Sequence, residues 1–277
     1  MSDRSREASG LLEARLNDHL ARAGRGSVAV SRFLTPGERR QAERWLTAHG
    51  VRAQARFWGG YSGAERQCLF LLPDFYLDMP ELMPAEGENP AGTIPDPEAN
   101  AVTAVRIRGS GFRVLAHRDY LGSLLGLGLE RDALGDIAVQ NEHEAVVFCT
   151  RRIAAFLLSN LQKVASDPVR CEEYTPDARF TDGRSYRPIA DTVASPRLDC
   201  VVAALTNLSR EEAQRAVRTG LVEVDFEPED RVDRILSAPA TLSVRGHGRY
   251  ILRAFEGETR RGRLRLRADQ LVLGRNL

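Results

Sequence analysis

Arginine side chains are concentrated near the C-terminal end of the chain, between Val244 and Arg267. This segment holds eight arginines and two glutamates, whereas the whole 277-residue chain has a formal net charge of only +1. A local excess of guanidinium groups on a near-neutral protein suits a phosphate backbone, because binding there displaces condensed counterions. The pattern therefore predicts a surface that binds a polyanion by electrostatic attraction.

The last of these arginines alternate with small or apolar residues in the segment RGRLRLR, residues 261–267. Successive side chains of a β-strand point to opposite faces of a sheet, so alternate residues share one face. The spacing predicts a strand that projects four arginines from one side: Arg261, Arg263, Arg265 and Arg267. A solvated strand face that discourages edge-to-edge aggregation would show the same alternation. The residues that precede the segment must decide between the two interpretations.

Two short helices are expected immediately before the basic segment. Ser195 suits an N-cap and Pro196 the first helical position, where the missing amide hydrogen is not needed. Asn207 or Ser209 could cap a second helix, and Gly220 could end it in the left-handed conformation. The helices would bring further arginines next to the basic strands.

The order of residues through this region resembles the small RNA-binding domain named after ribosomal protein S-four, also called the alpha-L motif. The signature positions are occupied by Arg197, Leu198, Asp199, Ser209, Arg210, Ala213, Val217, Gly220, Val222 and Val224. The later segment 244–249 is similar to the strand of that motif, and Asp225 stands where Asn is usual. The resemblance implies that residues 195–277 form an RNA-binding domain.

RNA contacts are expected from both the helices and the strands of this domain. The expected residues are Arg197, Asp199, Ser209, Arg210, Arg215 and Arg218 from the helices, and Arg245, Arg249, Arg261, Arg263 and Arg265 from the strands. Together they would clamp a structured RNA backbone. The glycines on either side of His247 would let the strand approach the RNA closely.

Two upstream blocks extend the resemblance over nearly the whole chain. The blocks FWGGYSGAER, residues 57–66, and HRDYLGSLLGLGLERDALGDIAV, residues 117–139, closely resemble the YlmH family of bacterial RNA-binding proteins. The matching residues are Phe57, Gly59, Gly60, Tyr61, Gly63, Glu65, Arg66, His117, Arg118, Leu121, Gly122, Ser123, Gly126, Leu127, Gly128, Arg131, Gly135 and Asp136. Members of that family carry the same alpha-L domain at their C-terminus.

The resemblance implies a non-catalytic protein that binds large-subunit ribosomal RNA and tRNA on the ribosome, in ribosome-associated quality control. Two alternatives remain open. The first is an RNA-modifying enzyme of the pseudouridine-synthase type, with Asp119 of the segment His117–Asp119 as its catalytic carboxylate. The second is an interaction protein linked to cell division, whose basic face would bind an acidic partner. Asp119 is better explained as a first-turn carboxylate that favours the helix dipole.

The remaining chain predicts the α+β class. Residues 1–78 are expected to form helices and a β-hairpin, and the acidic, proline-rich residues 79–100 a mobile surface loop without regular structure. Residues 101–174 alternate strand, helix, strand, strand, helix and strand, the split βαβ order of ferredoxin-like (RRM-like) domains. The polar residues 175–194 are expected to be a linker before the domain at 195–277.

RNA contacts of the middle domain are expected to go chiefly to phosphates. An RRM stacks bases on aromatic residues of its central strands, but Phe148 is the only aromatic on the predicted hairpin. The residues available for phosphate contacts are Arg106, Arg108, Arg118 and Arg131.

Composition favours a cytoplasmic protein without metal or cofactor. The N-terminal segment lacks the apolar core of a signal peptide, and no apolar run approaches the roughly 20 residues of a membrane span. The 4 cysteines are scattered without a C-x-x-C pair, which argues against a zinc site or a disulfide framework.

Overall fold

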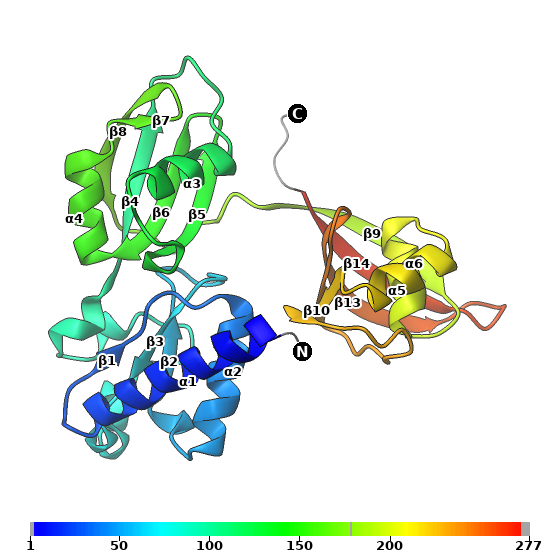
Figure 1. Cartoon of the computed structure of the whole chain (residues 1–277), viewed down its shortest axis with the longest axis horizontal. Coiled ribbons are helices and arrows are strands. Elements are labelled where there is room, and N and C mark those ends of the chain that lie inside the picture. Colours follow the sequence, from blue (N-terminus) through cyan, green and yellow to red (C-terminus); the bar gives the residue numbers. More distant parts are fainter. Residues whose placement is uncertain (1–2, 178, 273–277) are drawn as a thin grey trace. The chain divides into compact units, whose positions relative to one another are not determined.

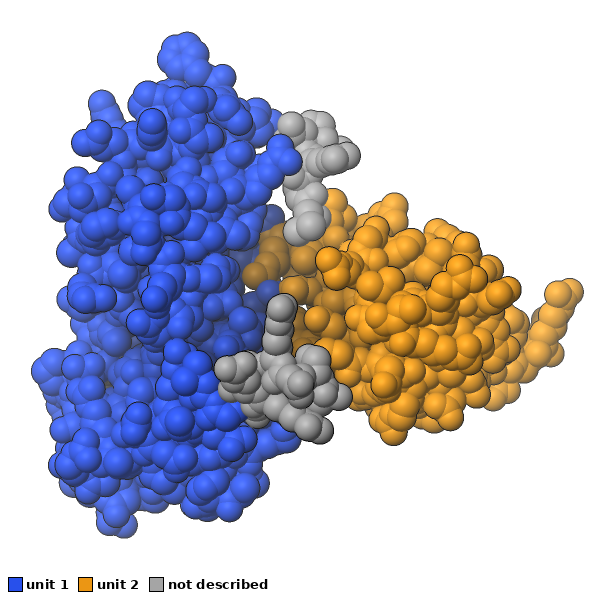
Figure 2. Space-filling model, viewed as in Figure 1, with its two compact units in different colours: residues 1–183 blue, residues 184–277 orange. Residues whose placement is uncertain are grey.

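The structure of the chain is a computed structural model that describes residues 3–177 and 179–272. The chain divides into two compact units, residues 1–183 and 184–277, which are coloured separately in Figure 2. Each unit combines helices with antiparallel strands, and every strand pairing among the described residues is antiparallel. The predicted α+β class is confirmed at this level.

The first unit begins with two helices over a small sheet (Figure 1). The elements are α1 (Asp3–Ala23), β1 (Ala29–Val30), α2 (Pro36–Ala48), β2 (Ala55–Trp58) and β3 (Cys68–Leu71), with the sheet order β1-β3-β2. Leu16 and Leu46 from the helices pack against Leu69 and Leu71 of the sheet. Thr35 caps α2 in a capping box with Glu38, so the predicted helix start is confirmed. The expected helices and β-hairpin are present.

The acidic, proline-rich stretch covers the other face of this small sheet. It forms four short 3₁₀ helices: η2 (Asp74–Asp78), η3 (Pro80–Leu82), η4 (Pro90–Gly92) and η5 (Pro97–Asn100). Tyr76 and Ile94 are buried in one cluster with Phe70 of β3. The Asp96 carboxylate accepts a hydrogen bond from the Val28 amide at 3.2 Å. The stretch lacks α-helix and strand, as expected, but it is a packed cover and the expected mobile surface loop is wrong.

The middle region of the first unit contains two helices and a larger sheet. Its elements are β4 (Val102–Gly109), α3 (His117–Gly126), η6 (Arg131–Ala133), β5 (Leu134–Asn141), β6 (Glu144–Thr150), α4 (Arg151–Asn160), β7 (Lys163–Val164) and β8 (Asp167–Tyr174). The sheet order is β5-β6-β4-β8-β7. Leu124 and Leu157 from the helices pack on Val105 and Ile107 of β4. The predicted order of strands and helices is therefore found.

The face of this sheet opposite α3 and α4 is also covered. Phe148 of β6 is 0% exposed and packs against the Tyr61 ring at a centroid distance of 4.7 Å and the Phe180 ring at 5.5 Å. A Cβ on Gly60 would overlap the Phe148 ring. This contact requires glycine and seats the turn after β2 on the sheet.

The second unit places two helices on one face of a six-stranded sheet (Figure 1). Its elements are β9 (Ser185–Val193), α5 (Leu198–Thr206), α6 (Arg210–Arg218), β10 (Val222–Val224), β11 (Glu227–Pro228), β12 (Ala240–Val244), β13 (Gly248–Glu258) and β14 (Leu264–Val272), in the sheet order β11-β10-β12-β13-β14-β9. Val202 and Val217 from the helices share one core with Leu242, Leu252 and Leu266 from the strands. Two helices followed by a strand region were expected here.

Residues expected to form a linker belong to this sheet. β9 pairs along its whole length with β14, from Val193 opposite Leu264 to Ser185 opposite Val272. The expected linker is therefore wrong for residues 185–193. β9 lies at an edge of the sheet and most of its side chains are exposed, so it lacks the apolar alternation that marks a strand in sequence.

The helix caps of the second unit differ in part from expectation. α5 begins at Leu198 with Arg197 as its N-cap, so the expected cap at Ser195 is wrong. The cause is a bridge between Arg197 and Ile235, which keeps the chain extended up to the helix. Ser209 caps α6, as expected for one of the two candidates. Gly220 follows α6 with φ +70°, as expected for a helix end.

Candidate nucleic-acid interface

A buried carboxylate holds two arginines at the start of the helices in the second unit. Asp199, in the first turn of α5, is 0% exposed. It accepts hydrogen bonds from Arg197 Nε at 3.1 Å and Nη2 at 3.2 Å, and from Arg210 Nε at 3.3 Å. Gln214 Nε2 donates to the same carboxylate at 2.8 Å. One acidic group therefore orients three side chains from two helices.

The arginines of this cluster keep donors for an external anion. The side chains of Arg197 and Arg210 remain 33% and 58% exposed. One carboxylate shared by two guanidinium groups leaves one net positive charge, and each guanidinium has five N–H donors. Burial alone would raise the pKa of Asp199, but hydrogen bonds from Arg197 and Gln214 and the charge of Arg197 hold it well below its usual range. Asp199 is therefore ionised at neutral pH.

The expected contact between Asp199 and RNA is wrong, because its carboxylate is fully buried. Its structural role is to position Arg197 and Arg210. The types and spacing of these residues were visible in the sequence, but burial depends on how α5 and α6 pack, which the spacing does not give.

Ser209 lies at the start of α6, next to the turn between β12 and β13. Its hydroxyl accepts from the Glu212 amide at 3.2 Å, and its own amide donates to the Glu212 carboxylate at 2.9 Å. The hydrogen bond from Ser209 is the main reason that the pKa of Glu212 is lowered, and nearby Arg215 and His247 lower it further. The β12–β13 turn, which carries Arg245, therefore lies close to α6.

A second set of arginines lies on the face of the sheet opposite the helices. Arg265 and Arg267 of β14 are exposed and alternate with buried Leu266 and Ala268, which face α5 and α6. Alternate side chains of a strand point to opposite faces, so the predicted alternation is confirmed for this strand. Arg261 lies in the turn before β14, so its expected place on the strand is wrong.

The strand arginines differ in how many donors they have left. Arg253 pairs with Asp269 at 2.7 Å and Arg267 with Glu256 at 2.5 Å. Arg263 Nε donates to Thr192 Oγ1 at 2.9 Å. The Arg249 guanidinium lies over the Phe226 ring, 5.2 Å from its centroid. Among the described residues, the side chains of Arg218, Arg245, Arg260, Arg261 and Arg265 make no hydrogen bond or ion pair.

The structure does not gather all the expected RNA contacts on one face. Arg197, Arg210, Arg215 and Arg218 belong to the helical layer, whereas Arg249 and Arg265 project from the other side of the sheet. The β12–β13 turn is the part of the sheet that lies near α6. The expected clamp therefore becomes two basic surfaces that meet at this turn.

The arginines expected to bind RNA in the middle region are mostly occupied. Arg106 pairs with Glu144 and Glu172, both at 3.3 Å, and lies 3.9 Å from the centroid of the Tyr174 ring. Arg108 pairs with Glu144 at 3.0 Å. Arg118 alone of the four expected residues is exposed without a hydrogen bond or ion pair among the described residues. Base stacking on buried Phe148 is excluded.

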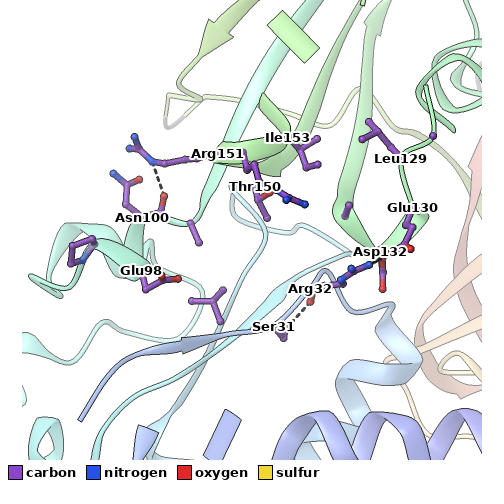
Figure 3. A pocket seen from close by; sticks show the side chains of 16 residues that line it. Ser31, Arg32, Glu98, Asn100, Leu129, Glu130, Asp132, Thr150, Arg151 and Ile153 are labelled. Carbon is purple, nitrogen blue, oxygen red and sulfur yellow. Dashed lines mark hydrogen bonds and ion pairs between the residues drawn. The ribbon is translucent and has the colours of Figure 1, made fainter. Parts of the chain in front are cut away.

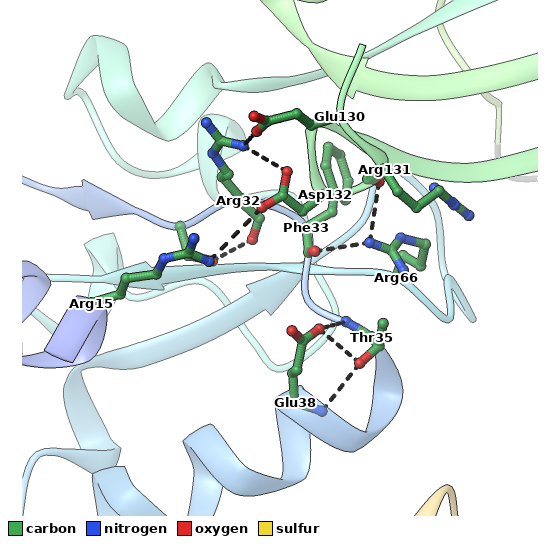
Figure 4. Close-up of polar contacts among 10 residues, drawn as sticks. Arg15, Arg32, Phe33, Thr35, Glu38, Arg66, Glu130, Arg131 and Asp132 are labelled. Carbon is green, nitrogen blue, oxygen red and sulfur yellow. Dashed lines mark hydrogen bonds and ion pairs between the residues drawn. The ribbon is translucent and has the colours of Figure 1, made fainter. Parts of the chain in front are cut away.

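Arg131, the fourth expected residue, belongs to a buried polar joint (Figure 4). Its guanidinium donates to the Leu134 carbonyl at 3.0 Å and the Gly135 carbonyl at 3.0 Å. Burial, and then the charge of nearby Arg66, lower the pKa of Arg131 to about 10. The Arg66 guanidinium donates to the carbonyls of Phe33, Arg131 and Leu134 at 3.1, 3.3 and 3.0 Å. Arg131 therefore holds the fold together and is not available to RNA.

The same joint continues through a buried carboxylate. Asp136 accepts from the Tyr61 hydroxyl at 2.8 Å and from the amides of Glu65 and Arg66 at 2.8 and 3.1 Å. Tyr61 to Arg66 come from the first upstream sequence block and Arg131 to Asp136 from the second. The two blocks are therefore one structural contact between the N-terminal and middle regions. Sequence reasoning gave the residues but not this pairing.

A cavity of about 710 Å³ lies between the N-terminal and middle regions (Figure 3). It is lined by residues of β1, η5 and the start of α4, among them Arg32, Glu98 and Arg151. Arg32 pairs with Asp132 at 2.7 Å and also with Glu130, and Glu98 pairs with Arg22 at 3.4 Å. Arg151 Nε donates to the Asn100 carbonyl at 2.8 Å. These charged groups serve contacts within the unit.

Asp119, the carboxylate of the enzymatic alternative, lies in the first turn of α3. It accepts a hydrogen bond from the Ala116 amide at 2.9 Å. The prediction that Asp119 is a first-turn carboxylate and that His117 starts the helix is confirmed. No group of three or more His, Cys, Asp or Glu residues suited to a metal ion occurs among the described residues.

Comparison with known proteins agrees with this division of the chain. Residues 95–177, which contain the larger sheet of the first unit, match the family model described as a putative RNA-binding domain in YlmH. A protein of Bacillus subtilis (strain 168), named ribosome-associated protein quality control protein P2, is 29% identical over 211 residues, which cover 76% of this chain and 75% of that protein. The resemblance to the YlmH family is confirmed.

A solved structure named cell division protein ylmH, from Streptococcus pneumoniae, has a TM-score of 0.45 and 18% sequence identity to this YlmH-like chain. It covers 63% of the YlmH-like chain and 93% of its own length. Within residues 3–177 and 179–272, the YlmH-like chain has no helix that is long and apolar enough to cross a membrane.

Proposed function

We propose that this YlmH-like chain is a non-catalytic RNA-binding protein that works on the ribosome in the cytoplasm. Its RNA partners are large-subunit ribosomal RNA and tRNA, and its process is ribosome-associated quality control. The observation that carries the proposal is the buried Asp199, which fixes Arg197 and Arg210 at the surface with donors left over. Prepositioned guanidinium groups suit phosphate oxygens because little side-chain entropy is lost on binding.

The proposal includes a domain assignment for each unit. The alpha-L domain comprises residues 195–277, preceded by the edge strand β9, and two helices on a basic sheet support it. Residues 101–174 form a ferredoxin-like, or RRM-like, domain. The sheet order β5-β6-β4-β8, with α3 and α4 on one face, supports this assignment.

RNA contacts in the second unit come from the two basic surfaces that meet at the β12–β13 turn. Arg197, Ser209, Arg210, Arg215 and Arg218 act from the helices, and Arg245, Arg249, Arg261, Arg263 and Arg265 act from the strands and turns. Arg218, Arg245, Arg261 and Arg265 have the most donors to offer, since their guanidinium groups are not engaged within the described residues. These contacts go to the RNA backbone, so they set affinity more than sequence choice.

Crosslinking and sequencing of RNA bound to the tagged protein in its own cells tests the proposal. We expect enrichment of large-subunit ribosomal RNA and tRNA. Absence of RNA above background would contradict RNA binding and favour an acidic protein partner. Enrichment at one uridine-containing position, with a modification that Asp119→Asn abolishes, would instead favour the RNA-modifying enzyme.

Ribosome co-sedimentation tests the surfaces. The double variant Arg210→Glu with Arg249→Glu should no longer sediment with ribosomes, because it reverses one charge on each basic surface. The matched control Arg25→Glu reverses an exposed charge in the first unit and should sediment like the wild type. Unchanged sedimentation of the double variant would contradict the assigned surfaces.

A further inference from the structure

The loop between β4 and α3, residues 110–116, presents one phenylalanine almost entirely to water. Phe112 is 96% exposed, the largest value among the exposed large hydrophobic residues of the described chain. Its neighbour Val114 is 44% exposed. Large aromatic residues are costly to leave in water, so a fully presented ring calls for an explanation.

Hydrogen bonds hold both ends of this loop in place. The buried Asp167 carboxylate accepts from the Ser110 amide at 3.0 Å and also from the Ser110 hydroxyl. The amides of Gly109 and Leu115 donate to the His143 and Glu142 carbonyls at 2.7 and 2.8 Å. Phe112 is therefore displayed on an anchored loop, which lowers the entropic cost of binding through it.

The approach to the ring is also fixed by the shape of the backbone. Gly111, immediately before Phe112, has φ +94°, a conformation that favours glycine. A Cβ on Gly109 would lie 2.6 Å from Asp167 Oδ2. Both glycines are thus needed for the turn that lifts the phenyl ring away from the sheet.

Positive charge surrounds the loop. Arg113 adjoins Phe112 and donates to the Ser166 hydroxyl at 3.1 Å. Arg170 lies on β8 opposite Arg108, one position before the end of β4, and Lys163 pairs in register with Pro168. The side chains of Lys163 and Arg170 are exposed and make no hydrogen bond or ion pair among the described residues. The acidic neighbour Asp167 is buried and occupied by Ser110.

We propose that Phe112 stacks on an unpaired nucleobase, while Arg113, Lys163 and Arg170 contact the flanking phosphates. A single aromatic ring among cations fits a π-faced, negatively charged ligand. A protein partner would call for a larger contiguous apolar patch than one ring and the half-exposed Val114. The match of residues 95–177 to a putative RNA-binding domain places the loop in the part of the chain where RNA contacts are expected. This proposal rests on the proposed RNA-binding function and adds a base contact to it.

Binding to two labelled RNAs tests the stack. The probes are a fluorescein-labelled hairpin with an unpaired adenosine loop and a fully paired duplex of the same length, measured by anisotropy at one salt concentration. Phe112→Ala should weaken hairpin binding roughly 5- to 150-fold and leave duplex binding unchanged, because paired bases are not available to a side chain. Phe112→Trp should restore hairpin binding, and Phe112→Leu should not. Phe156→Ala, which removes a partly exposed ring from α4, serves as the matched control.

The outcomes separate the stack from its rivals. Equal loss on hairpin and duplex, or full binding by Phe112→Leu, would overturn the stacking proposal. So would binding of the wild type, but not of Phe112→Ala, to vesicles of anionic phospholipid without any change on RNA. A wild type that binds both RNAs only as tightly as Phe112→Ala contradicts the stack alone. A wild type that binds neither RNA contradicts the proposed function as well.

Discussion

At the scale of single residues, the second unit separates groups that bind from groups that position. Asp199 has the place of a binding residue in the motif, yet it is fully buried. Arg197 and Arg210 were expected at the surface and lie there, held by that carboxylate. Residue type and spacing predicted the cluster. The division of roles could not be predicted, because it depends on which side chain is enclosed when α5 and α6 pack.

The charge of Asp199 should contribute to stability in a pH-dependent way. Asp199→Asn should lower the free energy of unfolding by about 1–3 kcal/mol at pH 7, since hydrogen bonds to a charged group are lost. The pKa of Asp199 is depressed in the folded state, so its contribution is present above about pH 4, the unfolded value, and is lost as pH falls further. Urea unfolding at pH 7 and pH 3 should therefore show the two proteins converging at low pH.

A second carboxylate makes the comparison of these two proteins necessary. Burial opposes the ionisation of Glu229, but hydrogen bonds from Arg231 and Arg234 outweigh it and lower the pKa of Glu229 to about 2. Wild type and Asp199→Asn both retain this group, so its titration cancels in their difference. A constant difference between pH 7 and pH 3 would contradict the role assigned to Asp199.

Arg265 should make an electrostatic contact that salt weakens. Its side chain is exposed and unpaired among the described residues, so Arg265→Ala removes a positive charge without leaving a carboxylate behind. We expect weaker RNA binding and a salt-dependence slope smaller by about 0.7 to 0.9. Affinity measured at several salt concentrations checks this, with Arg25→Ala as control. An unchanged slope would show that Arg265 does not contact phosphate.

At the scale of elements, apolar patterning decided what could be foreseen. The alternation in β14 and the helical spacing of α6 mark which side of each element is buried, and both elements were expected. β9 has most of its side chains exposed at the edge of the sheet. Its sequence reads as polar and irregular, and only its backbone pairing with β14 makes it a strand.

The pairing of β9 should matter for the stability of the second unit. A fragment of residues 184–277 should unfold cooperatively, because its core is made from its own residues between Val193 and Ala268. A fragment of residues 195–277 would lack Val193 and leave the β14 edge unpaired, which favours aggregation. Thermal unfolding followed by circular dichroism, with light scattering, should show a lower melting temperature for the shorter fragment. Equal melting temperatures would mean that β9 adds nothing.

The turn after β2 offers a test of close packing. Gly60→Ala should destabilise the first unit by about 1–3 kcal/mol beyond the backbone cost, because its Cβ would overlap the Phe148 ring. Gly63→Ala is the matched control, since Gly63 also has positive φ (+89°) but a Cβ there would meet nothing within 4 Å. Denaturant unfolding of both variants checks the difference. Equal losses would attribute the whole effect to backbone strain.

At the scale of the whole molecule, two units offer different chemistry to one RNA. The second unit carries guanidinium groups for the backbone, and the first unit carries the exposed Phe112. Domain order and the fold class could be foreseen from sequence. The joint of Arg66 and Asp136 could not, because its partners are separated by about seventy residues and meet only after both regions have folded.

Linked binding sites should bind more tightly than either alone. The full chain should bind the adenosine-loop hairpin more tightly than the fragment 184–277, since the second contact becomes intramolecular. Phe112→Ala in the full chain should remove part of this advantage. Anisotropy titrations of the three proteins check the order. Identical affinities of full chain and fragment would contradict an RNA contact from the first unit.

The pairing of β9 with β14 has a consequence for how the second unit can be inherited. Ser185, where the unit begins, lies opposite Val272 at the far end of β14, so its entry and exit strands are neighbours. A module with adjacent ends can be spliced into a surface loop of another protein without stretching its host. We therefore expect the unit to tolerate grafting and circular permutation, a property that suits an RNA-binding module able to join many different chains.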